Sequence, residues 1–481
     1  MACNCHLFPL TCPFSRRRFL SGCAASAAFV AFSALKSTSA TAAIPKAPTQ
    51  KARIRLLFTH EPPENATWPN IGYDYEARKK QLTQNLRQGC PKIEFLPATA
   101  QNSEGAKKIL ESDTNIDGYV VYMLGLWTGA PQVIAASGRP TVYVDDLYGG
   151  SGEFLSAYAA ARRNKLKVTG VSSSRFQDVA DAVNCFECLK KLHSSVILNV
   201  GAGPDWWVYI PPKLAKEHFG IKITDITFEQ LDKAYKNTNP AEARKWADRW
   251  INNAEKVVEP SRETIEKSGA MYLAMLDLMQ QHKAQAITIN CLGGFYGGHM
   301  TAYPCLGFFQ LNNDGLVGAC EADTISTITM LIMTYLVSRP GYISDPVIDT
   351  SKNQVIYAHC VAPNKVFGPE GAANPYHIRN HSEDRKGAAV RSLLPLGEMT
   401  TTVQFDLRKK QVLFHQGKTV ANIDEDKACR TKLAAEVKGD IDKLFNHWDK
   451  WGWHRVTYYG DLEQPVRHIA ALLGYELIEE A

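Results

Sequence analysis

The sequence lacks the features that mark nucleic-acid-binding and membrane-spanning proteins. It has no block of Lys and Arg, and the formal charge of +5 falls to 5 − 4 = +1 once residues 1–42, with four basic and no acidic residues, are set aside. No uninterrupted apolar run reaches the ~18–20 residues that a membrane span needs. We therefore expect no nucleic-acid surface and no stable membrane anchor. At 481 residues, 45% hydrophobic and 21% charged, the composition is that of a soluble protein of more than one domain.

The N-terminus has the charge and apolar pattern of an export signal. "SRRRFLSG" (15–22) precedes the small, apolar "CAASAAFVAFSAL" (23–35), and Ala40-Thr41-Ala42 is a candidate cleavage site. A buried helix that follows three arginines is the alternative. The pattern S-R-R-x-F-L resembles the twin-arginine signal of bacterial proteins that are exported after folding. We therefore expect residues 1–42 to be a signal peptide, the twin-arginine export machinery to be a partner, and the mature protein to be periplasmic.

Disulfides are permitted in an exported protein, but a chain that is exported after folding folds first in the reducing cytoplasm. Of twelve cysteines, four lie in the signal region, which leaves 12 − 4 = 8. Cys185 and Cys188 have redox spacing, but they lie inside an amphipathic helical pattern with no second pair nearby. Ordinary buried thiols are expected there.

The chain from residue 51 onward alternates between strand-like and helical patterns. Strand-like runs at 53–58, 116–123, 140–145 and 195–200 alternate with helical stretches, which favours βαβ units and a parallel sheet. The sequence pattern changes after "SRPGYISDP" (338–346), because strand-like runs then follow one another with few helical stretches between them. The predicted fold class is α/β, with two Rossmann-like α/β units and a smaller β-rich C-terminal domain. The expected domains are 51–205, 206–345 and 346–481.

Two carboxylates, Glu321 and Asp323, stand directly before an apolar helix expected over 325–337. Acids at that place can cap the helix and match its dipole. They also stand where α/β folds place functional groups, at the carboxyl end of a strand. The spacing alone leaves both interpretations open.

Histidines that could complete a metal site are far apart in the chain. Only His377 and His381 have i, i+4 spacing, and they lie in a Gly/Pro/Asn-rich segment that does not have a helical pattern. Any site must therefore be assembled from distant segments.

Four segments together resemble the L-fucose/L-arabinose isomerase superfamily, in its L-fucose isomerase-like branch. They are "CLGFFQLNNDGLVGACEADTISTITMLIMTYLVSRPGYISDP", "NQVIYAHCVAP", "IRNHSEDRKGAAVRSLLPLGEMTTTVQFD" and "WHRVTYYGD", and the resemblance covers roughly residues 285–475. It implies two α/β domains and a β-rich domain, often in a homo-oligomer. It also implies a divalent ion, typically Mn²⁺, on the open-chain sugar, and carboxylates that move a proton between C1 and C2 through an enediol.

The resemblance implies roles for individual residues of this chain. It makes Asp323 a metal ligand or catalytic base, with Glu321 as a catalytic carboxylate beside it, and it makes His454 a metal ligand. It places His359, and with it His381 and Glu383, in the substrate pocket.

One departure from the family pattern bears on the reaction. Family members have a further metal-binding glutamate, roughly 25–30 residues before the "CEAD" acid, whereas residues 278–313 contain no Asp or Glu. His299 lies in this stretch and is the expected replacement ligand. The sequence therefore leaves two hypotheses: aldose–ketose isomerisation of a free monosaccharide, for which export favours a neutral sugar, or altered chemistry as an epimerase, a lyase or a sugar-binding protein.

Overall fold

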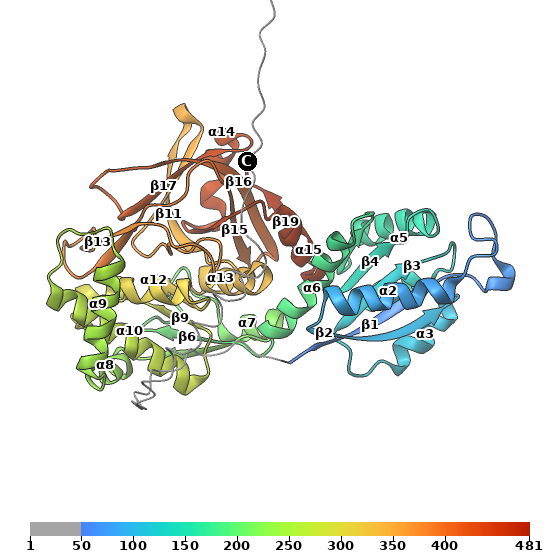
Figure 1. The fold of residues 1–481 in the computed structure, drawn as a ribbon, viewed down its shortest axis with the longest axis horizontal. Coiled ribbons are helices and arrows are strands. Elements are labelled where there is room, and N and C mark those ends of the chain that lie inside the picture. Colours follow the sequence, from blue (N-terminus) through green and yellow to red (C-terminus); the bar gives the residue numbers. More distant parts are fainter. Residues whose placement is uncertain (1–49) are drawn as a thin grey trace, which may run out of the picture. The chain divides into compact units, whose positions relative to one another are not determined.

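The computed structural model describes residues 50–481, so the predicted signal peptide lies outside the described residues. This part of the chain contains two parallel sheets flanked by helices, a barrel of mostly antiparallel strands and a small three-stranded sheet (Figure 1). The mixed α/β class with Rossmann-like units and a β-rich C-terminal region is therefore confirmed. Within residues 50–481, no helix combines the length and the apolar character that crossing a membrane would require.

The first sheet is parallel, with strand order β2-β1-β3-β4-β5. Its strands alternate side chains between two cores. Helices α2 and α6 pack on one face, and α3, α4 and α5 on the other. The elements are β1 (Ala52–Thr59), α2 (Tyr75–Gly89), β2 (Ile93–Ala100), α3 (Ser103–Ser112), β3 (Gly118–Met123), α4 (Ala130–Ala136), β4 (Thr141–Asp145), α5 (Ser151–Arg163), β5 (Val168–Val171) and α6 (Phe176–Leu192).

The second sheet is also parallel, with strand order β10-β9-β6-β7. Strand β6, which the sequence analysis assigns to the first unit, is hydrogen-bonded to β7 and β9 instead. Alternation of strands and helices predicts a parallel sheet, but it does not say which sheet a given strand joins. The elements are β6 (Val196–Val200), α7 (Pro212–Phe219), β7 (Lys222–Ile226), α8 (Phe228–Lys236), α9 (Pro240–Asn253), α10 (Arg262–His282), β9 (Ala286–Ile289), α11 (Cys291–Tyr296), α12 (Cys305–Asn313), β10 (Val317–Cys320) and α13 (Thr324–Val337).

The third sheet closes into a barrel. Its strand order is β15-β18-β11-β12-β17-β16-β19, and a further pairing of β15 with β16 closes the first six of these strands into a ring, while β19 pairs with β16. Closure leaves few unpaired strand edges. The elements are β11 (Tyr342–Asp349), β12 (Gln354–His359), β15 (Met399–Asp406), β16 (Gln411–Asn422), β17 (Thr431–Val437), α14 (Ile441–His447), β18 (Arg455–Tyr459), α15 (Glu463–Leu473) and β19 (Glu476–Glu479), and the three-stranded sheet consists of β14 (Ala389–Ser392), β13 (Tyr376–Arg379) and β8 (Lys256–Val257).

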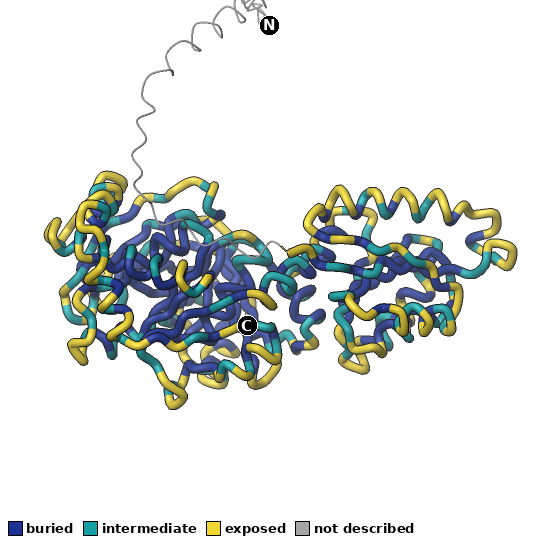
Figure 2. The backbone as a smooth tube through the Cα atoms, turned by 90° about the horizontal axis from the view of Figure 1, so that it is seen from below, coloured by how far each residue is buried: buried dark blue, intermediate teal, exposed yellow. Residues whose placement is uncertain are grey.

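Helix α13 lies between the second sheet and the barrel. Its residues from Thr324 to Met333 are all buried, and Figure 2 shows that buried backbone is gathered in the interior while exposed backbone lies mainly at the surface. The hydroxyl of Thr329 accepts the backbone N–H of Phe405 in barrel strand β15 at 3.0 Å. The helix thereby fixes the acids at its N-terminus against the barrel.

Candidate metal centre

Neighbouring barrel strands bring four potential metal ligands to one rim. Ser344 of β11 pairs with Arg455 of β18, so the next pair in the antiparallel register is Asp345 with His454. On its other side β11 pairs with β12, where Asp345 is opposite Ala358 and beside His359. Strand β17 follows, with Cys429 just before it. In strand order the four side chains are His454, Asp345, His359 and Cys429.

The second sheet supplies the remaining acids from the carboxyl end of β10. Glu321 and Ala322 both have positive φ angles, of 63° and 47°. The left-handed region is costly for residues other than glycine and persists where the surroundings enforce it. Here the Ala322 N–H donates to Ile289 O at 2.9 Å, and Trp206 Nε1 donates to Glu321 O at 3.0 Å. The turn directs the Glu321 side chain toward the barrel rim.

Glu321, Asp345 and His454 bring ligand atoms within reach of a single cation. His454 Nε2 lies 3.2 Å from Asp345 Oδ1 and 3.5 Å from Glu321 Oε2. For a hard cation with octahedral coordination at about 2.2 Å, adjacent ligands are about 3.1 Å apart. Two carboxylates and one imidazole are a donor set that Mn²⁺ accepts. The residues present therefore fit the divalent cation that the sequence analysis expects.

Asp323 uses its oxygens to cap a helix and to hold a histidine. Oδ1 accepts the backbone N–H of Ser326 at 2.8 Å, which makes Asp323 the N-cap of α13. Oδ2 accepts the Ser326 hydroxyl at 2.6 Å and the Nδ1–H of His454 at 2.8 Å. Such a carboxylate fixes the tautomer of a histidine and leaves Nε2 free for a metal. The geometry favours a positioning role for Asp323, where the sequence analysis expects a ligand or base.

The charges of the acids and histidines at the rim are strongly coupled. Burial disfavours the charged form of His454, but hydrogen bonds to Asp323 and Asp345 outweigh burial and raise its pKa to about 10. Likewise, Asp345 overcomes the burial of His359 and raises its pKa to about 9. Burial also opposes ionisation of Asp345, yet the two histidines bring its pKa well below the usual range. For Glu321 burial prevails and raises the pKa.

The other predicted site residues lie outside this group. His299 is exposed and stacks on Phe228, with ring centroids 5.2 Å apart, and it belongs to neither candidate metal group of the described residues. His381 is buried, and its Nδ1 lies 3.3 Å from Asp384 Oδ1. Glu383 is exposed and accepts the Tyr296 hydroxyl at 2.5 Å.

Asp345 is the residue that sequence reasoning missed. It lies in "SRPGYISDP", which the sequence analysis treats as a domain boundary because of its Pro and Gly. The structure places it inside β11, followed by Pro346 opposite Tyr357. A signal existed in the spacing, since Asp345 follows Glu321 by 345 − 321 = 24 residues. In the family pattern the metal-binding glutamate precedes the second acid by roughly 25–30 residues. The spacing of Glu321 and Asp345 is close to this, so Glu321 can be the family glutamate and Asp345 the second acid.

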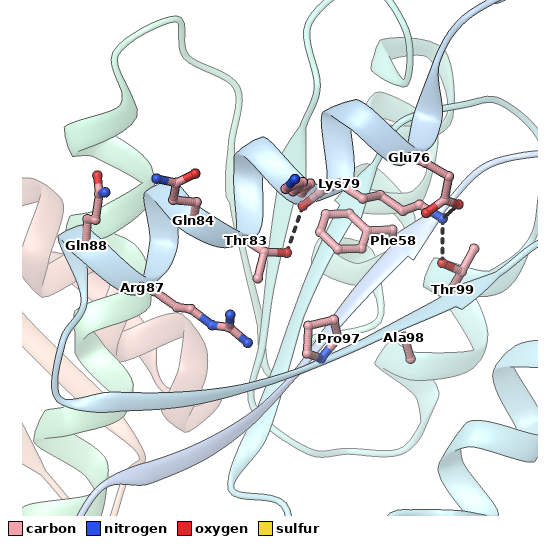
Figure 3. A pocket seen from close by; sticks show the side chains of 11 residues that line it. Phe58, Glu76, Lys79, Thr83, Gln84, Arg87, Gln88, Pro97, Ala98 and Thr99 are labelled. Atoms are coloured by element: carbon pink, nitrogen blue, oxygen red, sulfur yellow. Dashed lines mark hydrogen bonds and ion pairs between the residues drawn. The ribbon is translucent and has the colours of Figure 1, made fainter.

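A large surface hollow elsewhere in the described residues lacks this chemistry. A cavity of about 670 Å³ lies between α2 and β2 of the first sheet (Figure 3). Its lining has no histidine or cysteine, and Lys79 Nζ crosses it to donate to Thr99 Oγ1 at 3.1 Å. A smaller hollow of about 550 Å³, lined by Pro346 and Trp453, adjoins the barrel rim. Trp453 Nε1 donates to Asp345 Oδ1 at 3.2 Å, which connects this second hollow to the candidate metal centre.

These features define an α/β protein with a candidate metal centre between a parallel sheet and a β-barrel. No protein-family model matches the chain. It is 25% identical over 305 residues to a sulfoquinovose isomerase from Clostridium sp. (strain MSTE9), a match that covers 60% of this chain and 66% of the relative. It is 27% identical over 228 residues to a sulfoquinovose isomerase from Priestia megaterium (strain ATCC 12872 / QMB1551), covering 45% and 49%. A third, from Alkalicoccus urumqiensis, is 24% identical over 303 residues, covering 61% and 66%.

The chain therefore spans about half to two thirds of the length of these curated relatives. Among solved structures, a transcriptional regulator CelR–cellobiose complex covers 50% of this chain and 68% of that chain at 13% identity, with a TM-score of 0.17. A similarity this low carries no argument about the fold. The sequence relatives thus support the sugar-isomerase resemblance at modest identity.

Proposed function

We propose that the protein is a metal-dependent isomerase that interconverts an aldose and a ketose. One observation carries the proposal: Glu321 after β10, Asp345 inside β11 and His454 before β18 bring ligand atoms within 4.8 Å of one another, as one divalent cation would require. When bound there, the cation would polarise the carbonyl and hydroxyl oxygens of an open-chain sugar. The modest similarity to three proteins named sulfoquinovose isomerase supports the same reaction class.

The residues of the chain divide the work of the reaction. Glu321 and Asp345 present carboxylate oxygens on two sides of His454 Nε2, where they can accept and return the proton that moves between C1 and C2. Asp323 holds the His454 ring through Nδ1. Trp207, 52% exposed and with its ring centroid 5.5 Å from that of His454, offers an apolar face against which a sugar can pack.

Asp345 also bears on the alternative of lost chemistry. That alternative depends on a missing carboxylate upstream of Glu321. A second carboxylate is available downstream, from β11, which supplies the pair that a proton transfer through an enediol requires. The observation favours an active isomerase over an epimerase, a lyase or a binding protein.

The substrate is proposed as an unphosphorylated monosaccharide. A neutral sugar is what the predicted export favours, and a sulfonated sugar is what the names of the relatives favour. A twin-arginine-exported, periplasmic protein that works as a homo-oligomer remains our hypothesis for its cellular setting.

Proton exchange with solvent tests the reaction class directly. The protein, loaded with Mn²⁺, would be incubated in D₂O with L-fucose, D-arabinose and sulfoquinovose, and the C–H signals followed by NMR. We expect one sugar to gain deuterium at C2 while its ketose appears, and the sugar that does so to identify the substrate class. A metal-loaded protein that produces neither exchange nor ketose with any of the three would contradict the proposal.

A further inference from the structure

A second group of potential ligands adjoins the first and has a different chemistry. Asp345, His359 and Cys429 each offer one ligand atom, and these atoms lie mutually within 4.8 Å. Asp345 Oδ2 lies 3.1 Å from His359 Nδ1 and 3.5 Å from Cys429 Sγ. In this group a thiol takes the place that Glu321 has in the first.

The separations are compatible with tetrahedral zinc, and the thiol is what distinguishes this group from a site for a hard cation. With Zn–O and Zn–N bonds near 2.05 Å and a Zn–S bond near 2.3 Å, tetrahedral angles place N and O about 3.3 Å apart and S and O about 3.6 Å apart. The observed 3.1 Å and 3.5 Å lie within a few tenths of an ångström of these values. Three protein ligands leave a fourth position open.

Asp345 belongs to both groups but uses a different oxygen in each. Oδ1 faces His454 Nε2, and Oδ2 faces His359 Nδ1 and Cys429 Sγ. A carboxylate arranged in this way can bridge two cations, as in two-metal sites where the ions are about 3.5–4 Å apart. The strand order explains the arrangement, since β11 lies between β18 and β12 in the barrel.

The surroundings hold Cys429 in place. Ala428, the residue before it, has a φ of 59°, so the chain turns sharply just ahead of β17. Ser382 links Cys429 to a second thiol: its Oγ lies 3.9 Å from Cys429 Sγ and 3.6 Å from Cys360 Sγ. His359 is buried, and its side chain is 3% exposed. Buried groups of this kind are usually paired or bound to a metal.

We propose that Asp345, His359 and Cys429 form a second metal position, selective for a borderline or soft divalent cation such as Zn²⁺, which shares the Asp345 carboxylate with the first position. Thiolate favours Zn²⁺, whereas the two carboxylates and one imidazole of the first position suit Mn²⁺. Binding releases the Cys429 proton to solvent, and the thiolate completes the site. The inference rests on the proposed function in one respect only, which is that Asp345 is also a ligand of the first metal position.

Cobalt gives a readout that does not depend on activity, because a Co²⁺–thiolate bond absorbs in the near ultraviolet. Co²⁺ would be titrated into the full-length protein preloaded with Mn²⁺, and into the variants Cys429→Ser, Cys188→Ser, Glu321→Gln and Asp345→Asn. Cys188 is the matched control, a buried thiol on α6 that belongs to neither metal group. Elemental mass spectrometry after Zn²⁺ loading would count the ions, and thermal unfolding would verify that each variant is folded.

We expect the Co²⁺–thiolate band in the wild type, in Cys188→Ser and in Glu321→Gln. The band should be absent in Cys429→Ser. In Asp345→Asn it should be absent, or Co²⁺ should bind at least tenfold more weakly. Bound Zn²⁺ should fall from one per chain to none in Cys429→Ser. The proposal is overturned if the wild type shows no thiolate band, or if the band survives in folded Cys429→Ser. If the Co²⁺–thiolate band is unaffected in Asp345→Asn, the claim that both metal positions share the Asp345 carboxylate is wrong. A band in a protein that isomerises no sugar sinks the proposed function alone.

Discussion

Both parallel sheets end a strand in paired acids, but the partners of the acids differ. In the first sheet, Asp146 follows β4 and accepts from Arg78 Nη2 at 2.6 Å, while Asp145 accepts from the hydroxyls of Ser151 and Ser172 at 2.8 and 2.7 Å. In the second, Glu321 and Asp323 follow β10, and among residues 50–481 their only ion-pair partner is His454.

The difference in partners separates a structural pair from a candidate site. Arginine stays protonated at any pH a protein experiences, so its partner carboxylate remains paired wherever that carboxylate is ionised. Histidine can release its proton and offer a lone pair to a cation. Acids at the same position of the same fold class are therefore available for metal chemistry in one sheet and not in the other.

The largest effect is expected from removing the shared carboxylate at the barrel rim. Asp345→Asn should lower kcat/KM by roughly 10²–10⁴-fold, because it removes a proton-transfer group and a negative ligand together. The same change in the first sheet, Asp146→Asn, is the matched control and should leave kcat/KM within about threefold of the wild type. If kcat/KM fell equally in Asp345→Asn and Asp146→Asn, the distinction between a structural pair of acids and a candidate site would be wrong.

The buried pair that supports β18 is the next largest contribution. Arg455 Nη2 donates to Glu480 Oε1 at 2.8 Å, and both side chains are almost fully buried. Glu480→Gln leaves an unpaired guanidinium in the interior and should lower the free energy of unfolding by about 3–5 kcal/mol. Chemical denaturation measures the free energy of unfolding. A loss below about 1 kcal/mol in Glu480→Gln would contradict a stabilising role for the buried Arg455–Glu480 pair.

The same pair predicts how stability depends on pH. Burial opposes ionisation of Glu480, but the charge of Arg455 and a hydrogen bond from His415 lower its pKa from 4.5 to about 2. The stabilisation is therefore present above the unfolded-state pKa and is lost as pH falls through the folded-state value. Wild-type stability should decline between about pH 4.5 and 2, and Glu480→Gln should flatten that decline. An unchanged slope in the variant would show that other acids cause it.

A smaller effect separates the two roles considered for Asp323. If Asp323 positions His454, Asp323→Asn should weaken Mn²⁺ binding by about 10–100-fold, with full occupancy restored at high Mn²⁺. Amide oxygen still accepts from Ser326, so the helix cap persists. Calorimetric titration with Mn²⁺ decides, and a site that no concentration refills would instead make Asp323 a ligand.

The smallest effect is expected where the acid is already paired. The Arg78 side chain is 32% exposed and that of Asp146 9%, so Asp146→Asn should cost about 1 kcal/mol of unfolding free energy after allowance for solvent screening. Its bound metal should equal that of the wild type. A drop in metal content would instead indicate that Asp146 itself contributes to a metal site in the first sheet.

Periodicity predicted the elements that carry long apolar runs. Helix α13 was expected at 325–337 and lies at Thr324–Val337, and strand β12 lies in the part of the chain after residue 346 where successive strand-like runs were expected. Strands β2 and β11 were missed because each contains a proline, Pro97 or Pro346, and proline within a run argues against a central strand. β2 is an edge strand, which tolerates proline.

The candidate metal centre was predicted only in part from the sequence. His454 and the acids after β10 were found because motif positions name them. Asp345 was missed although its spacing from Glu321 carried a signal, and its place beside His454 and His359 follows only from the strand pairing of the barrel. The same pairing brings Cys429 beside His359 across β12 and β17. Contacts between distant strands are set by barrel closure, so the sequence indicated the chemistry but not the full set of ligands.

The most direct test of the central claim is the metal content of the folded protein loaded with Mn²⁺, measured by elemental mass spectrometry beside Asp345→Asn and Asp146→Asn. We predict about one Mn²⁺ per chain in the wild type and in Asp146→Asn, and a loss of most of it in Asp345→Asn. No bound metal in the folded wild type, or equal metal in all three proteins, would contradict a metal centre at the barrel rim.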